Sequence, residues 1–373
     1  MANKKNTKKK IERKPLALKH LLGKAVLLCA IVIAVLFIMD RKQVFGKDDL
    51  NNHLDWKWDW YYKLAENNVP LDVLFIGNSH MLTGFNPYLF TQQSGLNCFI
   101  LGAPGVNVAD LYFTLEEALK VTKPKVVVLE TYAINESEQY ELEKGDLNDQ
   151  IKSFKSRRNL PLKVKSTPFL FAHDNWLIAW SDVLRNHNMI FEEPDQIRRN
   201  LKNGGPRKSE RRNVYLGQFS RFQKGISQNT LIRYRNEGAP VDGEDYSISS
   251  SSEKYTRKFA ELCKENDVKL IFLTIPMYHE HVKNYDTWHK QLYSCIGRLS
   301  PYWLDLQEQN LTNIYTAEAF EDTYSKNQHL SSYGMNITAL VFAQYLDNVM
   351  NWLPKRFNDP QWQKYVATFP LKR

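Results

Sequence analysis

The chain has 373 residues, 43% of them hydrophobic and 13% aromatic, which supplies a full core and excludes an intrinsically disordered protein. Its formal net charge of +9 is concentrated at the N-terminus, where nine lysines and arginines stand against Glu12 within residues 1–24, so that about +1 is left for everything else. Because the rest of the chain is nearly neutral, we expect no nucleic-acid partner.

The N-terminal segment has the composition of a membrane anchor. Residues 21–40 are almost entirely apolar, without interruption from Ala25 to Met39, and are long enough to cross a bilayer. Asp40 and Arg41 follow where a cleaved signal peptide would carry small residues, so we expect a retained single-pass signal anchor. The positive-inside rule then makes residues 1–20 a basic cytoplasmic tail and places the rest of the chain outside the cell membrane.

Residues 41–70 are predicted to form a stalk that leads to an extracytoplasmic domain over residues 71–373. The stalk contains an aromatic cluster, which either rests at the membrane interface or packs on the domain: Trp56, Trp58, Trp60, Tyr61 and Tyr62. We favour packing on the domain.

Five short apolar runs in the domain are typical of buried parallel strands, and helical patterns separate them. The predicted strands are residues 72–77, 98–101, 125–130, 269–274 and 302–306, and the clearest helices are 109–121, 253–266 and 337–352. This alternation predicts an α/β fold, a three-layer α/β/α sandwich with a mainly parallel five-stranded sheet that is preceded by one transmembrane helix.

A basic insertion interrupts the alternation at about residues 136–250. Between Lys152 and Arg235 the chain has 18 lysines and arginines against 6 aspartates and glutamates. Two interpretations stay open: a solvated loop, or a lid or groove for an anionic polymer or lipid headgroup. On the second interpretation, Arg198 and Arg199 are candidate substrate-binding residues.

The cysteines do not point to metal or disulfide chemistry. Cys29, Cys98, Cys263 and Cys295 show no CxxC spacing and lie in segments with strand, helix or membrane character. We therefore expect no disulfide framework, no metal site and no cofactor.

Two segments far apart in the chain carry candidate catalytic groups. Ser79, in Gly77-Asn78-Ser79-His80, follows the first predicted strand at the carboxyl edge of the sheet, where open α/β sheets bind ligands. His329, in Asn327-Gln328-His329-Leu330, precedes the last predicted helix and is a candidate general base. A serine hydroxyl needs such a base and an oxyanion hole to act as a nucleophile.

These segments resemble conserved blocks of the SGNH/GDSL hydrolase superfamily. DVLFIGNSHMLTGFNP is similar to the first block and NQHLSSYG to the last, while LGAPGVN is similar to the second. The resemblance implies a flavodoxin-like SGNH fold with Ser79 as nucleophile and His329 as base. It implies an oxyanion hole built from the amides of Ser79 and Gly105, with Asn107 in the same loop as a candidate substrate contact.

The sequence departs from the pattern of this superfamily at two positions. The aspartate normally found three residues before the histidine is replaced by Lys326, so we consider Asp322 as the acid or a Ser79/His329 dyad without one. The oxyanion asparagine of the third block is matched only by Asn135, about one place late.

The segment TIPMYHEHV resembles the membrane-anchored branch of the superfamily, which is associated with cell-surface polymer acylation and includes proteins like the D-alanyl transfer protein and O-acetylation accessory proteins. The resemblance implies an SGNH-type serine esterase or acyltransferase acting on acetyl or alanyl groups of a cell-surface polysaccharide or teichoic-acid-like polymer. A membrane-bound O-acyltransferase is the expected partner. The alternative is a catalytically silent scaffold that binds the polymer or that partner.

Overall fold

The computed structural model describes residues 15–49, 53–134, 147–208, 214–219, 223–241, 248–308, 313–325 and 328–369. It divides into two compact units, and each is described by itself. The first unit combines residues 1–48 with 180–207, and the second combines residues 49–179 with 208–373.

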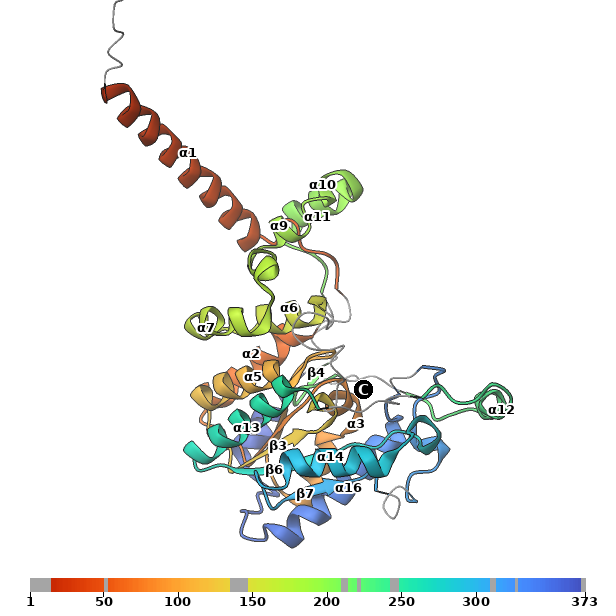
Figure 1. Cartoon of the computed structure of the whole chain (residues 1–373). Helices are drawn as coiled ribbons and strands as arrows, with labels where there is room; N and C mark the ends of the chain where they lie inside the picture. The colour runs from red at the N-terminus through yellow and green to blue at the C-terminus, as the bar shows by residue number, and fades with distance from the viewer. Residues whose placement is uncertain are drawn as a thin grey trace, which may run out of the picture. The chain divides into compact units, whose positions relative to one another are not determined.

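The second unit is built on a five-stranded sheet in which all neighbouring strands are parallel (Figure 1). Its order is β2-β1-β3-β6-β7, and the strands are β1 Val73–Ile76, β2 Cys98–Leu101, β3 Val126–Glu130, β6 Lys269–Thr274 and β7 Trp303–Asp305. Each lies in one of the predicted apolar runs, so the predicted parallel α/β fold is confirmed. β1 is at the point where the order reverses, which makes the carboxyl end of β1 the expected ligand site.

Helices cover both faces of this sheet. The helices of the second unit are α2 Leu54–Glu66, α3 Ser79–Gly84, α4 Pro87–Ser94, α5 Val108–Val121, α6 Leu147–Ser156, α7 Leu160–Leu170, α12 Gln228–Glu237, α13 Ser250–Glu265, α14 Tyr285–Ile296, α16 Ser332–Val349 and α17 Pro360–Val366, while α8 Trp176–Trp180 ends at the boundary with the first unit. Short 3₁₀ turns lie at Tyr132–Ile134 (η1), His173–Asn175 (η3), His279–His281 (η5) and Ala317–Ala319 (η6).

The two faces of the sheet bury alternate residues of each strand because successive side chains in a strand point in opposite directions. Leu74 and Ile76 of β1 pack in one core with residues of α2, α5 and α13. Val73 and Phe75 pack in the other core with residues of α3, α4 and α16. The two cores explain the continuous apolar runs and confirm the three-layer sandwich.

The aromatic cluster of the predicted stalk packs on the sheet. Trp58, Trp60 and Tyr61 of α2 are buried, and the Tyr61 ring lies 5.4 Å from that of Phe99 in β2. Trp60 stacks on Phe369 near the C-terminus, with ring centroids 4.2 Å apart. α2 is therefore part of the core of the second unit.

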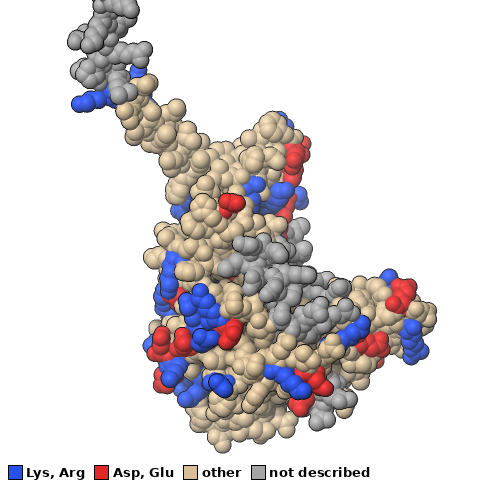
Figure 2. Space-filling model, viewed as in Figure 1, with Lys and Arg blue, Asp and Glu red and all other residues tan. Residues whose placement is uncertain are grey.

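The first unit contains the N-terminal helix α1, Pro15–Arg41, with α9 Asp182–Arg185, α10 Met189–Glu192 and α11 Pro194–Asn203. The stretch Lys19–Arg41 is long and apolar enough to cross a membrane, and its most apolar part is not buried. Figure 2 shows this helix with lysine side chains only near its N-terminal end and an uncharged surface over the remainder of the side in view. A membrane anchor and a signal sequence both fit this helix.

The described parts of the basic insertion are mainly helical. They form α6 to α12 and a short hairpin of β4, Val214–Tyr215, with β5, Gln218–Phe219. Residues 180–207 of the insertion belong to the first unit and the rest to the second.

Candidate functional site

The turn that carries Ser79 is fixed by its neighbours in the chain. Asn78 caps α3, accepting a hydrogen bond from the amide of His80 at 3.1 Å. A side chain on Gly77 would lie 2.5 Å from Cβ of Met81 and 2.7 Å from Cβ of Glu130, so only glycine permits this close packing. Ser79 is the first residue of α3 and is half-buried at the carboxyl end of β1.

His329 lies on a strand-like pairing just before α16. Phe320 and Leu330 form an antiparallel bridge, and the amide of Glu321 donates to the carbonyl of His329 at 2.9 Å. The same pairing brings Oε2 of Glu321 to 3.4 Å from Nδ1 of His329. The two side chains are only 15% and 17% exposed, respectively. The Glu321 carboxylate therefore lies at ion-pair distance from Nδ1, one of the two ring nitrogens of His329.

The other ring nitrogen of His329, Nε2, is buried and has no hydrogen-bond partner among the described residues. The His329 ring lies 5.1 Å from that of His80, the residue after Ser79, and His80 stacks on Tyr132 at 3.7 Å. The structure thus brings the Ser79 turn and the His329 loop to the same end of the sheet. Ser79 Oγ and His329 Nε2 do not form a hydrogen bond with each other.

Asp322, the acid predicted from the sequence, is hydrogen-bonded to residues at the start of α12. Its Oδ1 accepts hydrogen bonds from Oγ1 of Thr230 at 2.5 Å and from the amide of Ser227 at 3.2 Å. Burial opposes the effect, but these hydrogen bonds hold the pKa of Asp322 below its ordinary value. The carboxylate beside His329 belongs to Glu321, one residue before the predicted Asp322 and outside the superfamily's spacing, which falls on Lys326.

The conformation of the loop after β2 depends on glycines in the loop and on a buried lysine that is hydrogen-bonded to it. Gly102 has φ +125°, and a side chain there would lie 1.8 Å from the carbonyl oxygen of Gly77, so the loop lies directly against the Ser79 turn. Lys57 of α2 is fully buried and donates to the Gly102 carbonyl at 2.9 Å. Desolvation lowers the pKa of Lys57 to about 7.

The other residues of this loop have visible structural roles. Gly105 has φ +62°, and a side chain there would meet Oδ2 of Asp149 at 2.9 Å. Asn107 is mostly buried and caps α5, accepting from the amide of Asp110 at 3.1 Å. Asn107 therefore has a role in the fold that is independent of any substrate.

A second buried carboxyl group lies at the end of β3. Glu130 is fully buried, and its Oε1 accepts from the amide of Tyr132 at 2.9 Å. Desolvation raises the pKa of Glu130 to about 8, so this carboxyl is mainly protonated at neutral pH. Glu130 thereby supports the strand end that carries Tyr132, the ring against which His80 stacks.

Several sequence-predicted residues are not part of this arrangement. Asn135 and Lys326 lie outside the described residues. Arg198 and Arg199 belong to the first unit, where they pair with Asp195 at 2.9 Å and with Asp48 at 3.0 Å. The structure therefore gives both arginines local ion-pair partners.

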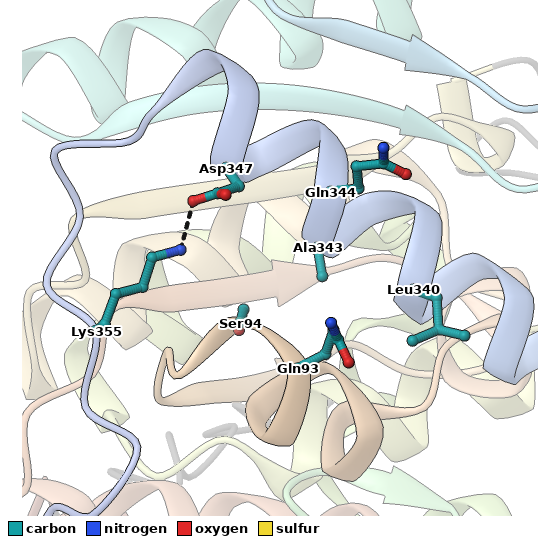
Figure 3. Close-up of a pocket in the computed structure, with 7 residues that line it drawn as sticks. All are labelled: Gln93, Ser94, Leu340, Ala343, Gln344, Asp347 and Lys355. Atoms are coloured by element: carbon teal, nitrogen blue, oxygen red, sulfur yellow. Dashed lines mark hydrogen bonds and ion pairs between the residues drawn. The ribbon is translucent and has the colours of Figure 1, made fainter.

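Two hollows in the second unit are lined by neither Ser79 nor His329. One, of about 330 Å³, lies between α4 and α16 and is bordered by an ion pair of Lys355 with Asp347 at 2.6 Å (Figure 3). The next residue, Arg356, pairs with Asp72 just before β1, which places this hollow toward the amino ends of the strands. The other, of about 520 Å³, adjoins η5 and the start of α14.

The described residues contain no cluster of three or more His, Cys, Asp or Glu side chains suited to a metal ion.

No family model matches the chain, and no curated protein is significantly similar to it. What the fold and the site define is an α/β protein with a five-stranded parallel sheet that gathers a serine turn and a glutamate-paired histidine at one edge.

Proposed function

We propose that this chain is an extracytoplasmic serine esterase or acyltransferase of the SGNH type, held in the cell membrane by α1. The observation that carries the proposal is the pair of Glu321 with His329: the His329 ring has an unpartnered Nε2 and lies 5.1 Å from the ring of His80, the residue after Ser79. The proposal requires this carboxylate, which lies 3.4 Å from Nδ1, to accept a hydrogen bond from Nδ1–H, because that bond fixes the imidazole tautomer in which Nε2 can accept a proton. Lys326 is then no obstacle to catalysis, since Glu321 supplies the acid from the neighbouring segment.

The proposed reaction proceeds through an acyl-serine. The proposal requires Oγ of Ser79 to come within hydrogen-bond distance of Nε2 of His329 when substrate binds. Oγ then attacks the ester carbonyl while His329 takes the hydroxyl proton, and the amides of Ser79 and Gly105 donate to the oxyanion. His329 returns the proton to the leaving alcohol as the ester C–O bond breaks. Water or a second hydroxyl group then gives a proton to His329 and attacks the acyl-serine, and the bond between the acyl carbon and Oγ breaks as His329 returns that proton to Ser79.

The proposed substrates are acetyl or alanyl esters of a cell-surface polysaccharide or a teichoic-acid-like polymer. Three points support this choice: the anchor-like α1, the resemblance of the Ser79, Gly105 and His329 segments to the SGNH blocks, and the resemblance of TIPMYHEHV to the membrane-anchored branch. A membrane-bound O-acyltransferase is the proposed source of acyl groups.

A silent scaffold is the second candidate function. It is favoured by one observation, that Nε2 of His329 lacks the hydrogen bond to the Ser79 hydroxyl that an assembled triad would have. Such a protein would bind the polymer or the acyltransferase without reacting.

The two functions are separated by active-site labelling. Full-length protein in detergent is treated with a fluorophosphonate probe and assayed with p-nitrophenyl acetate, alongside Ser79→Ala and His329→Ala. Ser294→Ala, at an exposed serine of α14, is the matched control. The enzyme proposal expects labelling and hydrolysis in the wild type and the control, and neither in Ser79→Ala. A wild type as unreactive toward both reagents as Ser79→Ala supports the scaffold.

A further inference from the structure

The segment that follows α1 is held by buried amide side chains of the first unit. Asn200 donates to the carbonyls of Val44 and Gly46 at 2.9 and 2.7 Å, and Gln196 donates to Gly46 at 3.1 Å. Both amide side chains are at least nine-tenths buried. Buried polar contacts of this kind are expensive to leave unmade, so α11 is specifically attached to the end of α1.

Apolar contacts determine the position along α1 at which α9 and α10 pack. Leu36 and Met39 of α1 pack on a small core that includes Val183 of α9 and Met189 at the start of α10. The 23 residues of the apolar stretch rise roughly 34 Å, close to the hydrocarbon thickness of a bilayer. Leu36 and Met39 lie within roughly 8 Å of its C-terminal end. Helices packed on them lie at the boundary between acyl chains and headgroups when α1 spans the membrane.

The same helices expose large apolar side chains. Phe191 is 86% exposed, Ile190 53% and Leu201 63%, although the unit has a core in which side chains of this size are buried. Transfer of a phenylalanine or isoleucine side chain from water to an apolar phase is favourable, so these side chains favour burial in an apolar surrounding. Arg198 and Lys202 are exposed cations of α11, suited to anionic headgroups.

We propose that α9, α10 and α11 form a membrane-interface collar at the outer end of α1, with the lipid bilayer as its partner and Phe191 and Ile190 inserted among the acyl chains. The occupant is lipid because the core of the collar includes the last turns of a membrane-length helix. Short amphipathic helices with aromatic and basic side chains bind lipid interfaces in this way. The inference rests on the proposed anchor role of α1 and does not depend on the proposed esterase chemistry.

The test places a fluorescent reporter on the collar. Full-length protein, with Cys29 and Cys295 replaced by serine, receives one new cysteine, Phe191→Cys or Asp195→Cys, and is labelled with a nitrobenzoxadiazole maleimide. Asp195 is the matched control because its side chain is charged, 84% exposed and in the same unit. Labelled protein is reconstituted into vesicles of phosphatidylethanolamine and phosphatidylglycerol that contain nitroxide-labelled lipid.

The proposal expects the reporter at Phe191 to be quenched several-fold more strongly by the nitroxide lipid than the reporter at Asp195, and to be protected from aqueous iodide. Equal iodide access at both positions would overturn it, and a membrane protein would then be the occupant to test. Ile190→Cys repeats the measurement at a second position. Because the fluorophosphonate reaction uses Ser79, labelling of the same variants reports separately on the proposed enzyme.

Discussion

Replacing Glu321 by glutamine removes the negative charge beside His329 while keeping the shape of the side chain. Two unit charges 3.4 Å apart attract by about 5 kcal/mol at an effective dielectric constant of about 20. Because both side chains remain 15 to 17% exposed, solvent screening reduces this to about 2 to 3 kcal/mol. The imidazolium forms only as Ser79 reacts, so the loss falls on the transition state and lowers kcat/KM roughly 30- to 150-fold.

The measurement is the rate of fluorophosphonate labelling, together with kcat/KM for p-nitrophenyl acetate. The matched control is Asp322→Asn at the next residue, whose carboxylate is bound by Thr230 and Ser227. We expect this control to change the rate by less than about threefold. If Asp322→Asn slows the reaction as much as Glu321→Gln, or if Glu321→Gln keeps the wild-type rate, the assignment of Glu321 as the acid is refuted.

Three further predictions concern buried groups around the site. The folded pKa of Lys57 is about 7 against an ordinary value of 10.5, so the unfolded chain binds more protons between these pH values and stability rises with pH across that window. Lys57→Met removes this rise, which urea unfolding at pH 7 and pH 9.5 measures. For Glu130 the pH dependence has the opposite sign. Its folded pKa is about 8 against an ordinary value of 4.5, so the folded chain binds more protons between these pH values and stability falls as pH rises across that window. Glu130→Gln abolishes that fall. If either variant keeps the wild-type dependence of the free energy of unfolding on pH, burial of that side chain is not the cause of the pH dependence. Gly102→Ala forces a side chain to within 1.8 Å of the Gly77 carbonyl oxygen, and we expect a loss of about 3 kcal/mol or more in the free energy of unfolding. Wild-type stability in that variant would show that the loop relaxes freely.

The sheet could be predicted because buried parallel strands are continuous apolar runs, and each of the five runs contains a strand. The proximity of the Ser79 and His329 segments also follows from the sequence, since both lie at the carboxyl edge of one sheet. Glu321 could not be found this way. Its place beside His329 depends on the bridge between Phe320 and Leu330, a pairing across a turn that no spacing rule reveals.

The predicted stalk shows a second limit of sequence reasoning. Alternating tryptophans in residues 54–66 suit both a membrane interface and a protein core, so the sequence only favoured packing on the domain, which the burial of Trp58, Trp60 and Tyr61 confirms. The decision comes from partners distant in the chain, such as Phe99 and Phe369, against which α2 packs. The burial of Lys57 results from the same packing of α2, and the sequence likewise does not reveal it.

These contacts predict that the second unit needs α2 in order to fold. α2 buries five large apolar side chains in the core of the second unit: Leu54, Trp58, Trp60, Tyr61 and Leu64. At about 2 kcal/mol each, their loss removes about 10 kcal/mol, which is as large as the whole stability of a typical domain. A chain that begins at residue 49 should therefore unfold cooperatively, while one that begins at residue 71 should aggregate or lack a thermal transition. Circular dichroism and scanning calorimetry compare the two, and equal melting temperatures would show that residues 49–70 are a stalk after all.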